Sequence, residues 1–259
     1  MTDLGTVLWV SAVVIAVAVT LLWLVSLAVR DSGIVDIFWG TGFVLVAWAV
    51  FLIAEGSNSR RLLLVVLTSL WGARLTIYLA WRNLGKAEDY RYAAMRAKWA
   101  SRWWWWSYFQ VFLLQGVLIW VVSLPVQAGQ VPASPAIGWL ALAGSVVWLV
   151  GMLFEGIGDL QLARFKADPA NRGRVMDGGL WRYTRHPNYF GNFLIWWGIW
   201  LVAAESGAWW TVAGPIVMSI LLLRVSGVAM LERTITERRP GYAEYIRRTS
   251  AFLPRPPRP

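Results

Sequence analysis

The chain has 259 residues, of which 58% are apolar and only 15% are charged, and its net charge at neutral pH is +10. A soluble globular domain has roughly 45–50% apolar and about 25% charged residues, so this composition excludes a water-soluble fold, a disordered chain and a collagen-like chain. The absence of Cys excludes disulfides, thiolate metal sites and a Cys nucleophile. The sequence therefore predicts an all-α, polytopic integral membrane protein.

Seven apolar segments are long enough to cross the roughly 30 Å hydrocarbon core of a bilayer as helices. In chain order they cover residues 4–29, 34–54, 62–81, 103–125, 137–163, 189–204 and 207–231. The first segment lacks the basic n-region and the small-residue cleavage site of a signal peptide, which predicts a retained helix. No repeat or low-complexity segment divides the chain, so we expect residues 1–259 to form a single seven-helix domain.

The basic residues lie mostly on one side of these spans. Most of the 24 Lys and Arg fall after the first, third and fifth spans and in the C-terminal tail, whereas the opposite side carries Arg60 and Arg61. By the positive-inside rule, we expect the N-terminus outside and the C-terminus in the cytosol. The four Trp residues at 103–106 follow Arg102 and are typical of a membrane–water interface. Because the Lys and Arg residues lie on one side of the predicted spans, we expect them to face the lipid bilayer, and we expect no nucleic-acid partner.

Charged and polar residues inside the spans mark candidate functional positions, because such residues are costly in a bilayer. One set is spaced i, i+4 and i+8 and so shares a face of the third helix: Arg74, Tyr78 and Arg82. The others are Asp36 at the start of the second span, Glu155 and Asp159 in the fifth, and Arg224 and Glu232 at the end of the chain's last span. These residues either form structural ion pairs between helices or line a cavity near one leaflet.

The densest polar stretch covers residues 171–192. Pro187 suits the first turn of a helix, whose free backbone N–H groups and dipole favour an anion. The cations near it are Arg174, Arg182 and Arg185, and His186 lies beside them. Asn188, Asn192 and Trp196 are spaced to line one wall below. The stretch predicts a site for a phosphorylated cofactor, and the alternative is that these basic loops bind the membrane surface.

Two kinds of site are excluded by the sequence. His186 is the only His, so no His-based metal centre is expected, and we predict no metal-binding residue. The chain has neither a P-loop nor a G-x-G-x-x-G segment after a strand, so a nucleotide would not be held by a Rossmann domain.

The segment at 178–191, Gly-Gly-Leu-Trp-Arg-Tyr-Thr-Arg-His-Pro-Asn-Tyr-Phe-Gly, resembles the signature of the integral-membrane steroid 5-alpha-reductases, and most closely their bacterial seven-span branch. The resemblance extends to Val-Asp-Ile-Phe-Trp-Gly at 35–40, to Asp-Tyr-Arg-Tyr at 89–92, and to Arg-Pro-Gly-Tyr at 239–242. An Arg-His-Pro-x-Tyr motif also occurs in membrane isoprenylcysteine carboxyl methyltransferases and sterol C14 reductases.

The resemblance implies an NADPH-dependent reductase that acts on the double bond conjugated to a 3-oxo group, such as that of a Δ4 steroid. Hydride would pass to C5 while a polar group polarises the ketone oxygen. The substrate cavity would lie mainly among helices 1–4, and the cofactor site among helices 5–7 and the cytosolic loops. A monomer in the bacterial inner membrane is expected, with its cofactor site facing the cytosol.

Site residues are carried over by position. The catalytic candidates are Asp36, Tyr78 and Trp71. Asp36 lies near the family's carbonyl-binding Glu and would have to be protonated to donate a hydrogen bond. The expected cofactor-binding residues are Arg74, Arg82, Asp159, Lys166, Arg174, Tyr183, Arg185, His186, Asn188, Tyr189, Asn192, Trp196, Arg224 and Glu232.

The sequence departs from the family pattern at several of these positions. Trp71 stands where the eukaryotic enzymes have a Tyr, Asn192 stands where they have Glu, and Val228 and Glu232 fall near their His and Tyr. Two other classes therefore stay open. The first is a membrane methyltransferase that uses S-adenosylmethionine, and the second is a transporter or lipid-binding protein without enzymatic activity.

Overall fold

A computed structural model describes residues 2–133, 137–225 and 241–258, and the described part is helical with no strand. The chain divides into two compact units. Unit 1 comprises residues 1–141 and 202–214, and unit 2 comprises residues 142–201 and 215–259. The expectation of a single domain stays a prediction.

Five helical segments within the described residues are long and apolar enough to cross a membrane: Leu4–Val29, Ile34–Ile53, Asn58–Asn83, Tyr90–Val122 and Trp139–Ala167. They correspond to the first five predicted spans. The sixth corresponds to α9 (Pro187–Ala204), whose first turns carry polar side chains, and the seventh to the shorter apolar helix Trp209–Arg224. Residues 226–231 of the seventh predicted span lie outside the described residues.

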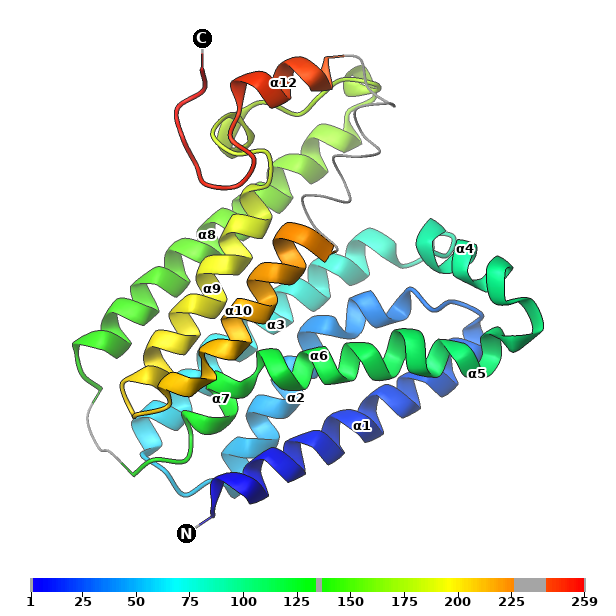
Figure 1. Cartoon of the computed structure of the whole chain (residues 1–259). Coiled ribbons are helices and arrows are strands. Elements are labelled where there is room, and N and C mark those ends of the chain that lie inside the picture. The colour runs from blue at the N-terminus through cyan, green and yellow to red at the C-terminus, as the bar shows by residue number, and fades with distance from the viewer. Residues whose placement is uncertain (1, 134–136, 226–240, 259) are drawn as a thin grey trace. The chain divides into compact units, whose positions relative to one another are not determined.

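Unit 1 begins with α1 (Leu4–Val29), α2 (Ile34–Ile53) and α3 (Asn58–Asn83) (Figure 1). The α2 and α3 backbones approach closely at Gly40 and Gly72, where a Cβ added to Gly72 would lie 2.6 Å from the Gly40 carbonyl oxygen. Small residues permit such close packing of membrane helices, and a hydrogen bond of 3.0 Å between the Thr41 and Thr76 hydroxyls adds to it. This crossing fixes the start of α2 beside the end of α3.

The fourth apolar segment is not one regular helix. It contains α4 (Tyr90–Trp99), η1 (Ala100–Arg102), α5 (Trp103–Ser107), a π-helical turn η2 (Tyr108–Leu113) and α6 (Leu114–Val122), and α7 (Leu124–Ala128) follows. Ala100 has a positive φ of 44°, which breaks the helix between α4 and the Trp-rich turn. The chain therefore bends before the apolar part of this segment begins.

A half-buried carboxylate, Glu205, lies at another end of unit 1. Glu205 accepts hydrogen bonds from the backbone N–H groups of Gly138 (2.9 Å), Leu140 (3.0 Å) and Ala141 (3.2 Å). It also forms an ion pair of 3.5 Å with Arg60, whose side chain is 1% exposed. Glu205 therefore satisfies the first backbone donors of α8 (Trp139–Ala167) from a distant part of the sequence.

Unit 2 is built on α8 and α9, which lie side by side (Figure 1). Gly144, Gly151 and Gly158 recur at seven-residue intervals along α8, which keeps them on one face. A Cβ added to Gly151 would lie 2.6 Å from the Gly191 carbonyl oxygen, and one added to Gly198 would lie 2.6 Å from that of Gly144. We call this contact the glycine seam. Unit 2 also contains η3 (Pro169–Asn171), η4 (Gly179–Arg182) and α12 (Tyr242–Arg248).

The apolar helix that follows α9 consists of η5 (Trp209–Val212), α10 (Ala213–Ile220) and a π-helical turn, η6 (Leu221–Val225). Arg224 lies in η6, and its side chain is exposed.

Candidate functional site

The predicted site residues divide between the two units. Asp36, Trp71, Arg74, Tyr78 and Arg82 belong to unit 1. The others belong to unit 2, and Glu232 lies outside the described residues.

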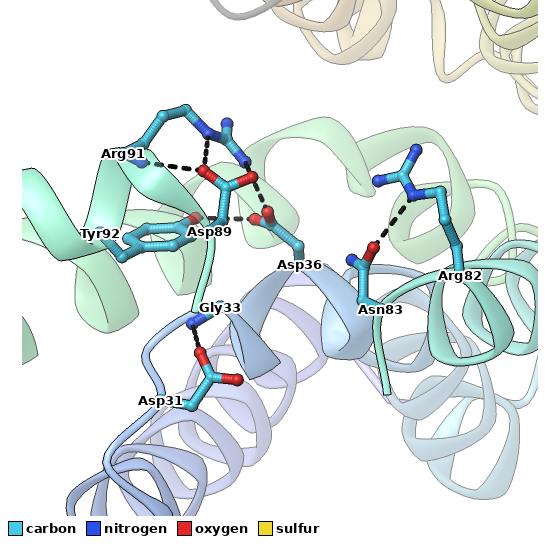
Figure 2. A network of polar contacts seen from close by, with 8 residues as sticks. All are labelled: Asp31, Gly33, Asp36, Arg82, Asn83, Asp89, Arg91 and Tyr92. Atoms are coloured by element: carbon cyan, nitrogen blue, oxygen red, sulfur yellow. Dashed lines mark hydrogen bonds and ion pairs between the residues drawn. The ribbon is translucent and has the colours of Figure 1, made fainter. Parts of the chain in front are cut away.

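Asp36 is the centre of a polar network at the start of α2, which Figure 2 shows. Arg91 Nη2 donates to Asp36 Oδ2 at 2.7 Å, and the Tyr92 hydroxyl donates to Asp36 Oδ1 at 2.7 Å. Asp89 holds Arg91 in place by accepting hydrogen bonds from its Nε and its backbone N–H, both at 2.9 Å. The Asp89 carboxylate thereby also caps the N-terminus of α4.

These contacts give Asp36 a different character from the one that the resemblance implies. Both of its oxygens already accept hydrogen bonds, one of them from a guanidinium and the other from a phenol hydroxyl. A protonated Asp36 that donates to a ketone oxygen would have to give up part of this network. We interpret Asp36 in this structure as an acceptor that orients Arg91 and Tyr92.

A pocket of about 250 Å³ lies beside this network. Its lining includes Asp31, Asp36, Asn83, Lys86 and Asp89, so it is formed by the start of α2, the end of α3 and the connection to α4. It is a small pocket with both polar and apolar lining at the end of these helices.

Glu88, in the same connection, fastens it to the turn before α2. Its carboxylate accepts from Arg96 Nη2 and from the Ser32 backbone N–H, both at 2.8 Å. Burial raises the pKa of Glu88, but the hydrogen bonds and charge of Arg96 and the Ser32 N–H outweigh it, so the pKa lies below its usual value. Glu88 is therefore a carboxylate at neutral pH, and this end of unit 1 is held by ionic contacts.

The i, i+4, i+8 set in α3 lies on one face, as the spacing predicts. The guanidinium carbons of Arg74 and Arg82 lie 5.9 Å and 5.7 Å from the centre of the Tyr78 ring. Tyr78 thus lies between two guanidinium groups, and the negative face of its aromatic ring attracts both of them. Trp71 is different: it is fully buried and packs edge-on against Phe43 at 5.3 Å, so it belongs to the core between α2 and α3.

Two amide–carboxylate pairs join α8 to α9 one turn apart. Asn188 Nδ2 donates to Asp159 Oδ1 at 3.1 Å, and Asn192 Nδ2 donates to Glu155 Oε1 at 3.3 Å. Glu155, Asp159 and Asn192 are all buried. The glycine seam brings the two backbones close enough for these short side chains to meet. The structure therefore unites three predicted residues with Glu155, which sequence reasoning singled out as polar but did not assign to the site.

The aromatic and His residues of the motif lie at the start of α9. The rings of His186 and Tyr189 are parallel, with centroids 5.4 Å apart, and His186 is buried. Trp196 is fully buried two turns beyond Asn188, where it contributes to packing. The segment from His186 to Asn192 therefore combines a buried imidazole, a phenol and two amides at the start of α9.

Arg185 has a structural role that its place in the motif did not predict. It is buried, its Nη1 donates to the backbone carbonyls of Ile246 and Thr249, and its own N–H donates to the Ser250 carbonyl at 2.9 Å. Arg185 thus attaches the C-terminal tail to the start of α9. Of the other predicted cofactor residues in unit 2, those that are exposed are Lys166, Arg174, Tyr183 and Arg224.

Sequence reasoning missed Arg91 and Tyr92 as functional candidates, although both fall in the Asp-Tyr-Arg-Tyr segment that carries the resemblance. The sequence did not indicate that Arg91 contacts Asp36, because the two residues are 55 positions apart in the chain. Arg60 and Glu205 were also missed, and only the presence of a lone acid directly after an apolar span could have drawn attention to Glu205.

Comparison with known proteins gives a family but no activity. An uncharacterised protein of Schizosaccharomyces pombe is 28% identical over 269 residues, which cover 90% of this chain and 76% of the relative. A protein of Ustilaginoidea virens named "Probable O-methyltransferase ustE" is 38% identical over 53 residues, 20% of this chain and 18% of that protein. No solved structure matches the chain. A family model described as "Protein of unknown function (DUF1295)" matches residues 22–249, and since that match covers most of its length, the chain belongs to the DUF1295 family.

Proposed function

We propose that this chain is an NADPH-dependent reductase of the double bond conjugated to a 3-oxo group, acting on Δ4 steroids or similar lipidic enones. The observation that carries the proposal is the Asp159–Asn188 pair at the start of α9. The resemblance to membrane steroid 5-alpha-reductases assigns both residues to the cofactor, and the pair lies directly after the Arg-His-Pro segment that carries the resemblance.

The side chains around this pair suit a dinucleotide. Asn188 and Asn192 offer amides, and Asp159 offers a carboxylate that can accept from ribose hydroxyls. Lys166 and Arg174 are exposed cations of the same unit and could face its phosphates. NADPH, when bound, would supply the hydride, and the protein would supply binding, orientation and electrostatics.

On the substrate side, a hydrogen-bond donor is needed at the ketone oxygen. Hydride addition at C5 moves the electron pair of the double bond toward that oxygen, and the product forms when a proton is added at C4. The Tyr78 hydroxyl is our candidate donor, because Asp36 accepts hydrogen bonds from Arg91 and Tyr92. Arg74 and Arg82 beside the Tyr78 ring would stabilise negative charge that develops near it.

We further propose that all seven predicted spans cross the membrane, with the N-terminus outside and the C-terminus in the cytosol. The distribution of Lys and Arg supports this orientation. The cofactor would then bind on the cytosolic side of a bacterial inner membrane, and the protein would act as a monomer.

A second candidate is a membrane methyltransferase that uses S-adenosylmethionine. It is favoured by the short similarity to the protein named as an O-methyltransferase and by the Arg-His-Pro-x-Tyr motif. The number of Arg residues in the loops argues against it, because S-adenosylmethionine has no phosphate for them to neutralise.

The first experiment is mass spectrometry of any nucleotide that co-purifies with the detergent-solubilised chain, together with NADPH oxidation in the presence of androstenedione or progesterone. We expect bound NADP(H) and a product two mass units heavier than its substrate. Bound S-adenosylmethionine or its demethylated product would instead establish the second candidate. A protein that carries neither and turns over no enone would refute the reductase.

Exchanging the side chains of Asp159 and Asn188 tests whether this pair contacts the cofactor or only supports the fold. In N188D two carboxylates face each other, so binding of NADPH and folding should both weaken. The double variant D159N/N188D restores an amide–carboxylate pair with its members reversed and should restore folding, while NADPH binding stays weak. N58D is the matched control, because Asn58 Oδ1 accepts from Arg61 and an aspartate can do the same. Full NADPH binding by the double variant would show that the pair is only structural.

A further inference from the structure

The C-terminal tail of unit 2 encloses a basic pocket, most of whose arginines have no role in the proposed reductase. The pocket has a volume of about 330 Å³ and lies at the lower end of the size range of ligand pockets, roughly 300–1,000 Å³. Five arginines line it: Arg185, Arg247, Arg248, Arg255 and Arg258. We call it the tail pocket.

Backbone hydrogen bonds fix the walls of the tail pocket. The Arg255 N–H donates to the Tyr183 carbonyl at 3.0 Å, and the Arg258 N–H donates to the Arg248 carbonyl at 2.9 Å. Arg185, already described, binds the carbonyls at the end of α12. The tail is therefore folded back on α12 and on the segment before α9, so the pocket is formed before any ligand arrives.

Three of the five arginines that line the tail pocket have no ion-pair partner among the described residues. No carboxylate is among the described residues that line it. Arg247 pairs with Glu244, but the side chains of Arg248, Arg255 and Arg258 make no hydrogen bond or ion pair with any residue that the structure describes. Cations held close together repel each other, so an anion between them would be strongly attracted.

The pocket also has a defined place relative to the apolar helices. Arg185 lies two residues before the first residue of α9, and the tail joins it there. The pocket therefore lies beside the first turn of an apolar helix. The ends of helices that span a bilayer lie near the lipid headgroups. A guanidinium group can donate two parallel hydrogen bonds to the oxygens of one phosphate. Basic pockets beside membrane helices bind phosphate-bearing headgroups.

We propose that the tail pocket binds a phosphate group, supplied either by an anionic lipid headgroup or by a soluble phosphate compound. The proposal does not rest on the reductase activity. Arg248, Arg255 and Arg258 are the ligands, and Arg185 positions them by holding the tail.

The test uses the full chain in lipid nanodiscs, with phosphatidic acid in phosphatidylcholine as the lipid probe and inorganic pyrophosphate as the soluble probe. The variant R248Q/R255Q/R258Q replaces three guanidinium groups, which have no side-chain partner in the described structure, with neutral amides, so the fold should survive. The matched control R102Q/R164Q/R172Q removes the same charge from exposed arginines outside the pocket. Since each basic residue near a charged headgroup contributes roughly a fivefold effect, we expect about a hundredfold weaker binding in the pocket variant and little change in the control.

The two probes distinguish the sources. Binding of phosphatidic acid that pyrophosphate does not displace identifies a lipid headgroup, and displacement identifies a site open to soluble phosphate. Equal losses in the two variants would mean general surface charge and would overturn the proposal, as would the absence of binding by the wild type.

A second measurement on the wild type needs no variant. Phenylglyoxal modifies accessible arginines, and mass spectrometry locates the modified residues. Either probe, when bound, should protect Arg248, Arg255 and Arg258 but not Arg102. Uniform modification with and without the probes would overturn the proposal even if the triple variant failed to fold.

Discussion

Replacing Glu205 should destabilise unit 1 more than replacing any exposed carboxylate. Its side chain accepts from three backbone N–H groups at the start of α8 and pairs with buried Arg60. Loss of a helix N-cap costs about 0.5–2 kcal/mol, and removing one partner of a buried ion pair costs about 3–5 kcal/mol. Because these effects share one side chain they are not additive, and we expect E205A to lower the free energy of unfolding by about 3–5 kcal/mol. E205Q keeps an oxygen acceptor, so its loss should be about 1–2 kcal/mol.

The assay is unfolding by SDS in mixed micelles, followed by the fluorescence of the 20 Trp residues. E244Q is the control, because Glu244 is exposed and its pair with Arg247 lies on the surface, where ion pairs contribute little. If E205A unfolds at the same SDS concentration as E244Q, the carboxylate does not hold α8 and the reasoning is wrong.

The same site makes a prediction about pH. Burial raises the pKa of Glu205, but the N–H groups of Gly138, Ala141 and Leu140, together with Arg60, outweigh it and lower the pKa below its ordinary value of 4.5. A carboxylate whose pKa is lower in the folded state stabilises the fold above its unfolded pKa, and this stability is lost as the pH falls through the folded pKa. The difference in stability between wild type and E205Q should therefore be constant near neutral pH and shrink below about pH 4.5. A difference that grows on acidification would contradict the assignment.

Three further predictions concern the seam, the network and the topology. G191A should lower the free energy of unfolding by about 1–3 kcal/mol in the SDS assay, because the added Cβ meets the α8 backbone, and a neutral result would mean that the seam can open. Y92F removes a hydrogen bond to the Asp36 carboxylate and should cost about 1.5–3 kcal/mol in the same assay; no loss would show that the Arg91 pair is sufficient. Because the chain has no Cys, S59C and A170C are its only thiols when introduced, and a membrane-impermeant maleimide added to intact cells should label S59C and spare A170C. The reverse pattern would invert the proposed orientation.

The apolar runs were enough to predict most of the membrane helices. The first predicted span coincides with α1 (Leu4–Val29), and the second ends one residue beyond α2, because uninterrupted apolar sequence leaves the backbone no choice but a helix in a bilayer. The break at Ala100 and the π-helical turn at Tyr108–Leu113 were not predicted. Both depend on how neighbouring helices pack, which hydrophobic periodicity does not record.

The candidate site shows the same division between local and distant signals. The shared face of Arg74, Tyr78 and Arg82 follows from helix geometry and is confirmed. The role of Arg185 could not be predicted, because its acceptors are backbone carbonyls more than sixty residues away. The sequence shows where a cationic side chain is, but which acceptor it contacts depends on the tertiary fold.

The glycine seam also limits how molecules in the membrane can move around α9. Where the α8 and α9 backbones nearly touch, as at Gly151 and Gly191, there is no gap for an acyl chain or a flat ring system. Any apolar compound that reaches the Asp159–Asn188 pair from the lipid must therefore approach from a side of α9 other than the one facing α8. Selection among hydrophobic compounds should accordingly depend on bulky side chains on the remaining faces of α9, where rotamer changes can widen or narrow the passage, and be insensitive to the seam itself.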